Sequence, residues 1–525
     1  MIRKKLPIGI QTFAKIREDS HYYVDKTPYA LRLVDQGTHF FLSRPRRFGK
    51  SLFLDTLKEL FEGNAALFTG LHAETHWDWR ISYPVLRFSF GGGVLGSVLD
   101  LQQSLHRQLT GFEQQHDLPA AFPDIRSRFA EIIRRLHDKT GQRVVILIDE
   151  YDKPILDRIE QPEIARELRE GLKDFYSVIK DSDAHVRFAF LTGVSKFSKV
   201  SLFSGLNNLE DITVSPEYSA ICGYTDADVD SVFAAELEGL DRDEIRLWYN
   251  GYNWLGEAVY NPFDLLLLFR NREFKPYWFE TGTPTFLVKL LAERQTSLPQ
   301  LHRRQTSGSL LSTFDIDNIP TEALMFQSGY LTIAEQERVG AEQLITLCYP
   351  NLEVQQSLTA AMLGALTKNP SQGIAERASL LRLLRVNDFS AMRELITAFF
   401  SSIPNDWYRN NPIAQYEGYY ASVFYAYFAS LGLVLAVEDS SNQGRLDMAL
   451  KFNKQIYLFE FKVVELVPDG GALAQIKARG YADKYRALGQ QIHLIGVEFS
   501  KESRAVVGFE VELLQGVGSQ GGDSN

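Results

Sequence analysis

The sequence of 525 residues has little cysteine and no long apolar run. Its two cysteines, Cys222 and Cys348, lie far apart and in no Cys-x-x-Cys arrangement, which argues against a disulfide framework and a cysteine-rich zinc site. No signal-peptide core follows the basic start, and no stretch approaches the roughly 20 apolar residues of a membrane span. We therefore expect a cytoplasmic protein without a membrane partner.

An excess of positive charge is also missing. The chain carries 56 Lys and Arg residues against 66 Asp and Glu residues, a net charge of −10. This balance excludes a protein that binds nucleic acid through a blanket positive field, although it leaves room for a local groove. The ten histidines form no His-Glu-x-x-His motif, so a zinc enzyme is not expected either.

What the sequence does contain is a regular alternation of short apolar runs and amphipathic stretches over its first 225 residues, typical of an α/β domain with a parallel sheet. We expect strands at His39–Ser43, Val85–Phe90, Val144–Ile148 and Val186–Leu191. Helices are expected between them at Lys50–Glu62, Ser97–Gln115, Arg126–Lys139 and Glu163–Lys180. The length, at about 150 residues per domain, allows three to four such units.

The rest of the chain divides into three parts. Residues 226–370 are predicted to form a mostly helical lid or linker region, with a winged-helix-like unit as one interpretation and a strand-like piece at Gly329–Ile333. Residues 375–515 are predicted to form a second α/β domain. The Gly- and Ser-rich tail, residues 516–525, is expected to be disordered.

A phosphate-binding loop is indicated by residues 44–51, which lie directly between an expected strand and an expected helix. Such a loop needs a glycine, a lysine that reaches the terminal phosphates and a hydroxyl for Mg²⁺, and the helix after it offers its positive dipole end to an anion. We expect it to bind ATP through Arg46, Arg47, Phe48, Gly49, Lys50 and Ser51. Its first glycine is replaced by Arg44, so a loop lined by arginines and stiffened by Pro45 is expected.

The apolar run 144–148 strengthens this assignment because it ends in Asp149 and Glu150. A buried parallel strand has such a continuous run, and ligands bind at its carboxyl end. We expect Asp149, with Ser51, to hold Mg²⁺ and Glu150 to orient or deprotonate the attacking water. The alternative is that the two carboxylates cap the next helix and that Lys50 is a surface cation.

Five short segments of this region resemble the AAA-ATPase-like domain of an abundant bacterial family. The resemblance covers roughly residues 5–290 and rests on Tyr23-Val-Asp-Lys-Thr27, Leu42-Ser-Arg-Pro-Arg-Arg-Phe-Gly-Lys-Ser-Leu52, Ile148-Asp-Glu-Tyr-Asp-Lys-Pro154, Leu191-Thr-Gly-Val-Ser-Lys-Phe197 and Trp248-Tyr-Asn-Gly-Tyr252. The family shares the arginine-rich loop, so Arg44 is a family trait. The resemblance implies a P-loop NTPase with an ASCE-type parallel sheet.

A second candidate site lies in residues 444–462, where apolar and polar residues alternate on both sides of Asn453-Lys454. With a two-residue turn there, Asp447 lies directly across from Glu460. Two like charges so close are destabilising unless a cation lies between them, and Lys462 points to the same side as Glu460. We expect a Mg²⁺ site with an activated water. The alternative is a solvated face with exposed ion pairs.

Two helices extend this second set. Glu417 lies on an apolar helical stripe, where a carboxylate is costly unless it is paired or metal-bound. Gln475 lies on an expected helix at Ala472–Leu488. The ordered set resembles an α/β PD-(D/E)xK nuclease-like domain over residues 375–515. That resemblance assigns the roles of motif aspartate, ExK pair, first-helix acid and helix glutamine to Asp447, Glu460 with Lys462, Glu417 and Gln475.

Together the two sites predict an ATP-binding P-loop ATPase joined through a helical region to a Mg²⁺-dependent nuclease. Its partner would be nucleic acid, with DNA as the first expectation, and self-association into a homo-oligomer is a further expectation. The rival hypothesis is a nucleotide-controlled switch whose C-terminal domain only binds a partner. Aromatic clusters at Trp248–Trp254 and Tyr416–Tyr427 could stack on bases, but their spacing favours a place in the core.

Overall fold

The computed structural model describes residues 3–196, 208–282, 285–294, 296, 298–301, 303–311, 320–340, 342–367, 370–402, 417–433, 435–441, 444–503 and 505–514. The chain divides into two compact units, Met1–Gly282 with Gln305–Asn351, and Thr283–Arg304 with Leu352–Asn525. The predicted domain boundaries at residues 225, 370 and 375 stay a prediction, and the predicted tail lies outside the described residues. Among the helices described, none combines the length and the apolar character needed to cross a membrane.

A five-stranded parallel sheet forms the centre of the first unit, in the order β2-β3-β4-β1-β5. Its strands are β1 (His39–Ser43), β2 (Val85–Ser89), β3 (Val144–Asp149), β4 (Val186–Gly193) and β5 (Glu210–Asp211). All six residues of β3 are buried, as expected for a parallel strand that is covered on both faces. Because β4 lies between β1 and β3, the strand that precedes the phosphate loop and the strand that ends in two carboxylates are not neighbours, which is the ASCE arrangement.

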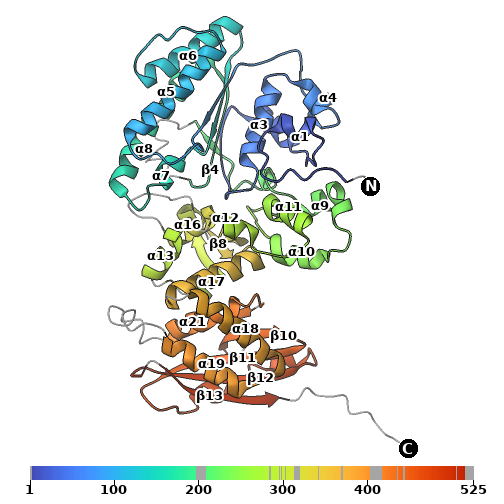
Figure 1. The fold of residues 1–525 in the computed structure, drawn as a ribbon, viewed down its shortest axis with the longest axis vertical. Coiled ribbons are helices and arrows are strands. Elements are labelled where there is room, and N and C mark those ends of the chain that lie inside the picture. The colour runs from blue at the N-terminus through green and yellow to red at the C-terminus, as the bar shows by residue number, and fades with distance from the viewer. Residues whose placement is uncertain are drawn as a thin grey trace, which may run out of the picture. The chain divides into compact units, whose positions relative to one another are not determined.

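Helices cover both faces of this sheet (Figure 1). On one face, α5 (Val98–Gln115), α6 (Ile125–Thr140) and α8 (Pro162–Asp181) pack together, and Phe88 of β2 contacts an aromatic ring from each of them. On the other face, α3 (Lys50–Phe61) packs on β2, β3 and β4. The predicted fold class and these predicted strands and helices are confirmed. Shorter helices complete this part of the unit: α1 (Phe13–Glu18), α2 (Thr27–Gln36), α4 (Ala73–His76) and α7 (Lys153–Leu156).

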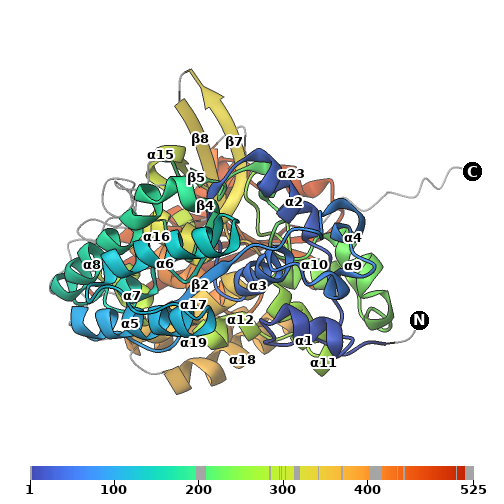
Figure 2. The same ribbon diagram turned by 90° about the horizontal axis from the view of Figure 1, so that it is seen from above.

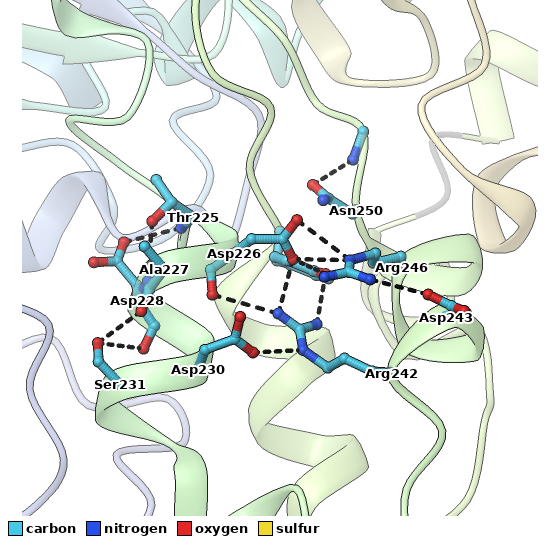
Figure 3. Close-up of polar contacts among 12 residues, drawn as sticks. Thr225, Asp226, Ala227, Asp228, Asp230, Ser231, Arg242, Asp243, Arg246 and Asn250 are labelled. Atoms are coloured by element: carbon cyan, nitrogen blue, oxygen red, sulfur yellow. Dashed lines mark hydrogen bonds and ion pairs between the residues drawn. The ribbon is translucent and has the colours of Figure 1, made fainter.

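The segment that follows the sheet is largely helical, with α9 (Asp226–Val232), α10 (Arg242–Tyr249), α11 (Pro262–Asn271), α12 (Tyr277–Gly282), α15 (Gly308–Leu311) and α16 (Thr321–Ser328). Figure 3 shows how α9 and α10 are joined: Arg242 donates hydrogen bonds of 2.8 Å to both Asp226 and Asp230. Arg246 contacts Asp226 at 3.3 Å, and a capping box at Thr225 begins α9.

A β-hairpin interrupts this helical segment and was not predicted in full. Its strands, β7 (Thr332–Val339) and β8 (Glu342–Cys348), form a three-stranded sheet with β6 (Arg304–Ser307). Figure 2 shows β7 and β8 side by side along their length. The predicted strand at Gly329–Ile333 was placed too early. Gly329 has φ +92° and ends α16 in the left-handed conformation, so the strand begins only at Thr332.

The second unit contains a five-stranded mixed sheet in the order β13-β12-β11-β10-β9. Its strands are β9 (Leu435–Ser441), β10 (Gly444–Phe452), β11 (Gln455–Val464), β12 (Gln491–Ser500) and β13 (Val506–Leu514), and only the β11–β12 pair is parallel. Its helices are α13 (Thr285–Glu293), α14 (Leu298–Leu301), α17 (Leu352–Thr367), α18 (Pro370–Val386), α19 (Phe389–Ser402), α21 (Glu417–Ala429), α22 (Gly471–Ala478) and α23 (Asp483–Arg486).

The sheet of the second unit is covered differently on its two faces. Phe424 and Phe428 of α21 contact Phe459 of β11, whose side chain lies on one face. On the other face, Ile476 of α22 belongs to a buried cluster with residues of β10, β11 and β12. The predicted helix Ala472–Leu488 was wrong in its length: Gly480, with φ +55°, interrupts it, so α22 and α23 are separate.

Candidate functional site

The predicted phosphate loop connects β1 to α3, and its lysine is turned into the loop. Lys50 Nζ donates to the main-chain oxygens of Arg44 and Pro45, both at 2.9 Å. The residue is only 7% exposed, and this burial lowers the pKa of its ammonium group, although the nearby Asp149 opposes the shift. Lys50 is therefore not a surface cation. Gly49 precedes the helix with φ +93°, a conformation that favours glycine.

Arg44, which replaces the first glycine of the common motif, does not line the loop. Its guanidinium donates to the main-chain oxygens of Ser43, Thr213 and Tyr218 at 2.8, 2.8 and 2.9 Å. It also lies 3.9 Å from the ring centroid of Trp254. Burial lowers the pKa of Arg44 to about 10. The expectation of a loop lined by this arginine was wrong, because its side chain satisfies buried carbonyl groups instead.

Aromatic residues of the following segment brace the loop from outside. Phe48 is buried against Tyr252 and Trp254, with ring centroids 4.7 and 5.6 Å apart. Trp278 Nε1 donates to the main-chain oxygen of Arg46 at 3.1 Å. Tyr252 and Trp254 are buried, as the aromatic spacing at Trp248–Trp254 indicated. Phe48, which was predicted among the nucleotide-binding residues, packs against them and is placed to support the loop conformation.

Two arginines of the loop remain exposed to solvent, Arg46 and Arg47. Arg47 adopts φ +70°, and its guanidinium lies 5.0 Å from the ring centroid of Phe263. The neighbouring Ser51 is partly buried in the first turn of α3. The loop therefore presents two long, exposed cationic side chains and a hydroxyl group beside the positive end of a helix. This arrangement suits phosphate groups.

The acidic pair lies at the carboxyl end of β3, as predicted. Asp149 is 4% exposed, and its Oδ1 accepts a hydrogen bond of 3.0 Å from Thr192 Oγ1. Glu150 has φ +54°, and burial, with a smaller contribution from Asp149, raises the pKa of its carboxyl group. The residue before α7 is Asp152, so neither carboxylate stands at the cap position of that helix.

Two small polar residues at the end of β4 and just after it, Thr192 and Ser195, hold carboxylates. Thr192 binds Asp149, and Ser195 donates from both its main-chain nitrogen, at 2.6 Å, and its hydroxyl, at 2.7 Å, to Asp152. A buried lysine turned into the loop, a serine at the helix start and a buried aspartate form a donor set that fits a nucleotide phosphate with Mg²⁺.

The second candidate site depends on the β10–β11 hairpin, whose predicted register is confirmed. Met448 pairs with Phe459 and Phe452 with Gln455, so the next residue along, Asp447, lies opposite Glu460. The turn residues Asn453 and Lys454 both have positive φ, +50° and +59°, as in a type I′ hairpin turn.

The two carboxylates converge at the point where the hairpin ladder ends. The Asp447 main-chain nitrogen lies 3.5 Å from Glu460 Oε2, and Asp447 Oδ2 accepts a hydrogen bond of 2.8 Å from the Phe461 main-chain nitrogen. Glu460 is only 2% exposed, and its Oε1 accepts a hydrogen bond from Gln475 Nε2. These contacts exclude the alternative of a solvated face with loose ion pairs.

Gln475 reaches Glu460 because α22 lies very close to the sheet. Gly496 of β12 pairs with Glu460, and a Cβ atom at Gly496 would lie 2.4 Å from the main-chain nitrogen of Leu473. A glycine at this position is therefore what allows α22 to approach. The close approach is a structural requirement that sequence analysis did not identify.

Lys462 lies one step further along the same face. It pairs with Glu498 of β12, which is 3% exposed and accepts hydrogen bonds from the main-chain nitrogens of Asp469, Gly470 and Ala472 at 2.9, 3.2 and 3.2 Å. The Lys462 ammonium approaches the start of α22 closely, 3.2 Å from where a Cβ atom of Gly471 would be. A hydrogen bond from the Gly471 nitrogen, with smaller contributions from Glu498 and Lys462, lowers the pKa of Asp469. The Lys462 ammonium, which comes from β11, therefore lies beside the start of α22.

Tyr481 is a member of this site that sequence analysis missed. It is 3% exposed. Burial raises the pKa of its hydroxyl, the charges of Glu460 and Asp447 add to this, and its hydrogen bond with Gln475 opposes it. An aromatic residue directly after the helix-breaking Gly480 was the available signal.

Glu417 is the first residue of α21, but its side chain lies outside the described residues. Its predicted role as a site acid therefore stays a prediction. Among the side chains that are described, no group of three or more His, Cys, Asp and Glu residues could hold a metal ion. The described site supplies two carboxylates, Asp447 and Glu460, whose oxygen atoms suit Mg²⁺, and Lys462 follows two residues after Glu460 on β11.

Comparison with known proteins finds two family models, one in each part of the chain that holds a candidate site. A family model described as "Predicted AAA-ATPase" matches residues 7–203, and a model described as "PD-(D/E)XK nuclease superfamily" matches residues 415–509. A protein of Azotobacter chroococcum mcd 1, described as "Uncharacterized protein in vnfD 5'region", is 64% identical over 515 residues, which is 98% of this chain and 100% of the relative. The similarity therefore extends through both units.

Proposed function

Since the chain belongs to the family of AAA-ATPase-like proteins with a C-terminal PD-(D/E)XK nuclease superfamily domain, we propose that it binds ATP in its first unit and cleaves nucleic acid with Mg²⁺ in its second. The observation that most strongly supports the proposed nuclease activity is the convergence of Asp447, Glu460 and Gln475 on one face of the sheet. These residues come from two strands and a helix. DNA is the proposed substrate.

In the first unit, Lys50 would exchange the main-chain oxygens of Arg44 and Pro45 for the terminal phosphates of ATP. Ser51 and Asp149 would hold Mg²⁺, which neutralises charge on the phosphates when it is bound. Glu150 would accept a proton from the attacking water. Thr192 would keep Asp149 in position through its hydroxyl group.

In the second unit, Asp447 and Glu460 would hold Mg²⁺, and Glu417 would join them from α21. The bound ion lowers the pKa of a water and stabilises negative charge on the phosphate. Lys462 would orient the nucleophile, and Gln475 would fix the orientation of Glu460. Nucleotide binding in the first unit would gate the cleavage or movement on DNA.

The proposed nuclease activity is tested by measuring cleavage of DNA and RNA substrates in the presence of Mg²⁺, with and without ATP. Asp447→Ala and Glu460→Ala should each reduce cleavage by about 100-fold or more, because each removes a charged group that stabilises the transition state. Glu512→Ala is the matched control, since Glu512 is an exposed carboxylate of the same unit that is paired with Lys477 at 2.7 Å. Unchanged cleavage in both site variants would contradict the proposal.

A second candidate function is a nucleotide-controlled switch whose C-terminal domain binds a partner without cutting. The net charge of −10 favours it, because nucleic acid gains no general attraction to such a chain. This candidate predicts tight ATP binding without turnover and no cleavage of any DNA or RNA. Lys50→Ala separates the two: an ATPase loses its turnover, whereas a pure switch loses nucleotide binding alone.

A further inference from the structure

Arg87 is a charged residue in the middle of β2, a strand of the central sheet. Its guanidinium bridges two carboxylates: Nη1 binds Asp55 Oδ1, and Nη2 lies 3.8 Å from Asp149 Oδ2. The Arg87 side chain is 26% exposed, whereas those of Asp55 and Asp149 are 6% and 5% exposed. Arg87 thus connects two buried carboxylates, and the proposed ATP chemistry does not use it.

Both carboxylates belong to elements of the nucleotide site. Asp55 lies on α3, four residues after Ser51, and Asp149 ends β3. Asp55 is itself held in place, because its Oδ2 accepts a hydrogen bond of 2.6 Å from the Phe13 main-chain nitrogen. Burial raises the pKa of Asp55, and the Phe13 nitrogen and Arg87 oppose that shift. Asp55 therefore fixes one nitrogen of the guanidinium, and this determines where the other nitrogen lies.

We propose that Arg87 is a positioning residue that divides its charge between Asp55 and Asp149 and thereby sets how strongly Mg²⁺ and nucleotide binding reinforce each other. The inference rests on the proposed nucleotide site. A cation beside a carboxylate reduces the attraction of that carboxylate for a second cation. Arg87 thus keeps Asp149 partly neutralised before Mg²⁺ arrives, and the bridge to Asp55 limits how far this neutralisation goes.

The bridge predicts opposite effects for substitutions of Arg87 and of Asp55. In Arg87→Met, Asp149 loses a neighbouring positive charge, so Mg²⁺ should increase nucleotide affinity more than it does in the wild type. In Asp55→Asn, Arg87 keeps only Asp149 as an anionic partner, so Mg²⁺ should increase nucleotide affinity less. A residue that merely supported the fold would lower stability in both variants and leave the effect of Mg²⁺ unchanged.

The experiment measures the dissociation constant of ADP with the full-length protein, once with Mg²⁺ and once with EDTA. The measured quantity is the ratio of the two affinities. We expect this ratio to rise about fivefold in Arg87→Met and to fall about fivefold in Asp55→Asn, the change expected for a partly exposed ion pair. Arg87→Lys should restore only part of the wild-type ratio, because one ammonium cannot bridge both carboxylates.

Arg128→Met is the matched control, because Arg128 forms a similarly buried ion pair with Glu113, between α5 and α6. Its ratio should equal that of the wild type. Thermal unfolding identifies any variant that does not fold. If Arg87→Met does not fold, the affinity ratios of Arg87→Lys and Asp55→Asn test the proposal. Ratios that move in the same direction, or not at all, overturn the role of Arg87. A wild-type protein that binds no ADP in either condition overturns the proposed nucleotide site itself.

Discussion

The two candidate sites differ in what holds their charged groups before any ligand binds. In the phosphate loop, the cations Lys50 and Arg44 are bound by main-chain oxygens of the same unit. In the second unit, the carboxylates of Asp447 and Glu460 are bound by a main-chain nitrogen and a side-chain amide from neighbouring elements. In the first site the loop holds its own lysine, and Arg44 connects the loop to a distant segment. The second site exists only because strand register and helix packing bring separate elements together.

The largest effect that tests this comparison is expected at Lys50. Lys50→Ala should reduce nucleotide turnover by about 100-fold or more, because it removes the charge that meets the phosphates. Turnover of ATP is measured alongside Lys58→Ala, a lysine of the same helix that pairs with Glu59 and Glu62. Equal turnover in the two variants would show that Lys50 has no special place in the site.

Replacing Arg44 by the common glycine should destabilise the first unit instead of improving its loop. Arg44→Gly leaves three buried carbonyl groups without their charged donor, a loss of about 3–5 kcal/mol in the free energy of unfolding. Arg47→Gly is the control: Arg47 has positive φ, so glycine relieves strain there and stability should change by less than about 1 kcal/mol. Chemical denaturation measures both. A stable Arg44→Gly variant would contradict the structural role of this arginine.

The dependence of the second site on packing is tested at Gly496. Gly496→Ala pushes α22 away from the sheet, which should cost about 2 kcal/mol of stability and, by displacing Gln475 from Glu460, about tenfold in cleavage. ATP binding should not change. At Gly364 in α17, a Cβ atom meets no atom within 4 Å, so Gly364→Ala should be neutral or slightly stabilising. Wild-type cleavage in Gly496→Ala would show that the close approach of α22 is not needed.

The smallest expected effect concerns pH in the first unit. Glu150 must be ionised to accept a proton, and its pKa is raised in the folded protein. ATP hydrolysis should therefore decline as the pH falls, with a midpoint above the ordinary value for glutamate. The raised pKa also means that ionised Glu150 disfavours folding: this penalty is absent below the unfolded-state pKa and fully present above the folded-state pKa. A rate that is flat down to the ordinary glutamate pKa would contradict this account.

Local pattern was sufficient to predict most of the fold and the register of the second site. The run 144–148 is apolar because helices cover both faces of β3, and the sequence pattern predicts this burial. The pairing of Asp447 with Glu460 followed from period-two alternation around a short turn. Both inferences depend on residues that are close together in the sequence.

Features that depend on distant contacts could not be predicted. Arg44 looked like a phosphate ligand because its partners, Thr213, Tyr218 and Trp254, lie about 170 residues or more further along the chain. The contacts of Arg87 and Tyr481 likewise involve residues that are distant in the sequence and that only the fold brings close. The break at Gly480 was missed because one glycine is tolerated in many helices.

The most direct test of two separate sites in one chain is to measure ATP binding and Mg²⁺-dependent DNA cleavage on the same preparation of Asp447→Ala. The account predicts wild-type affinity for ATP together with lost cleavage, because Asp447 belongs to the second unit alone. Cleavage at the wild-type rate would contradict the assignment of the second site.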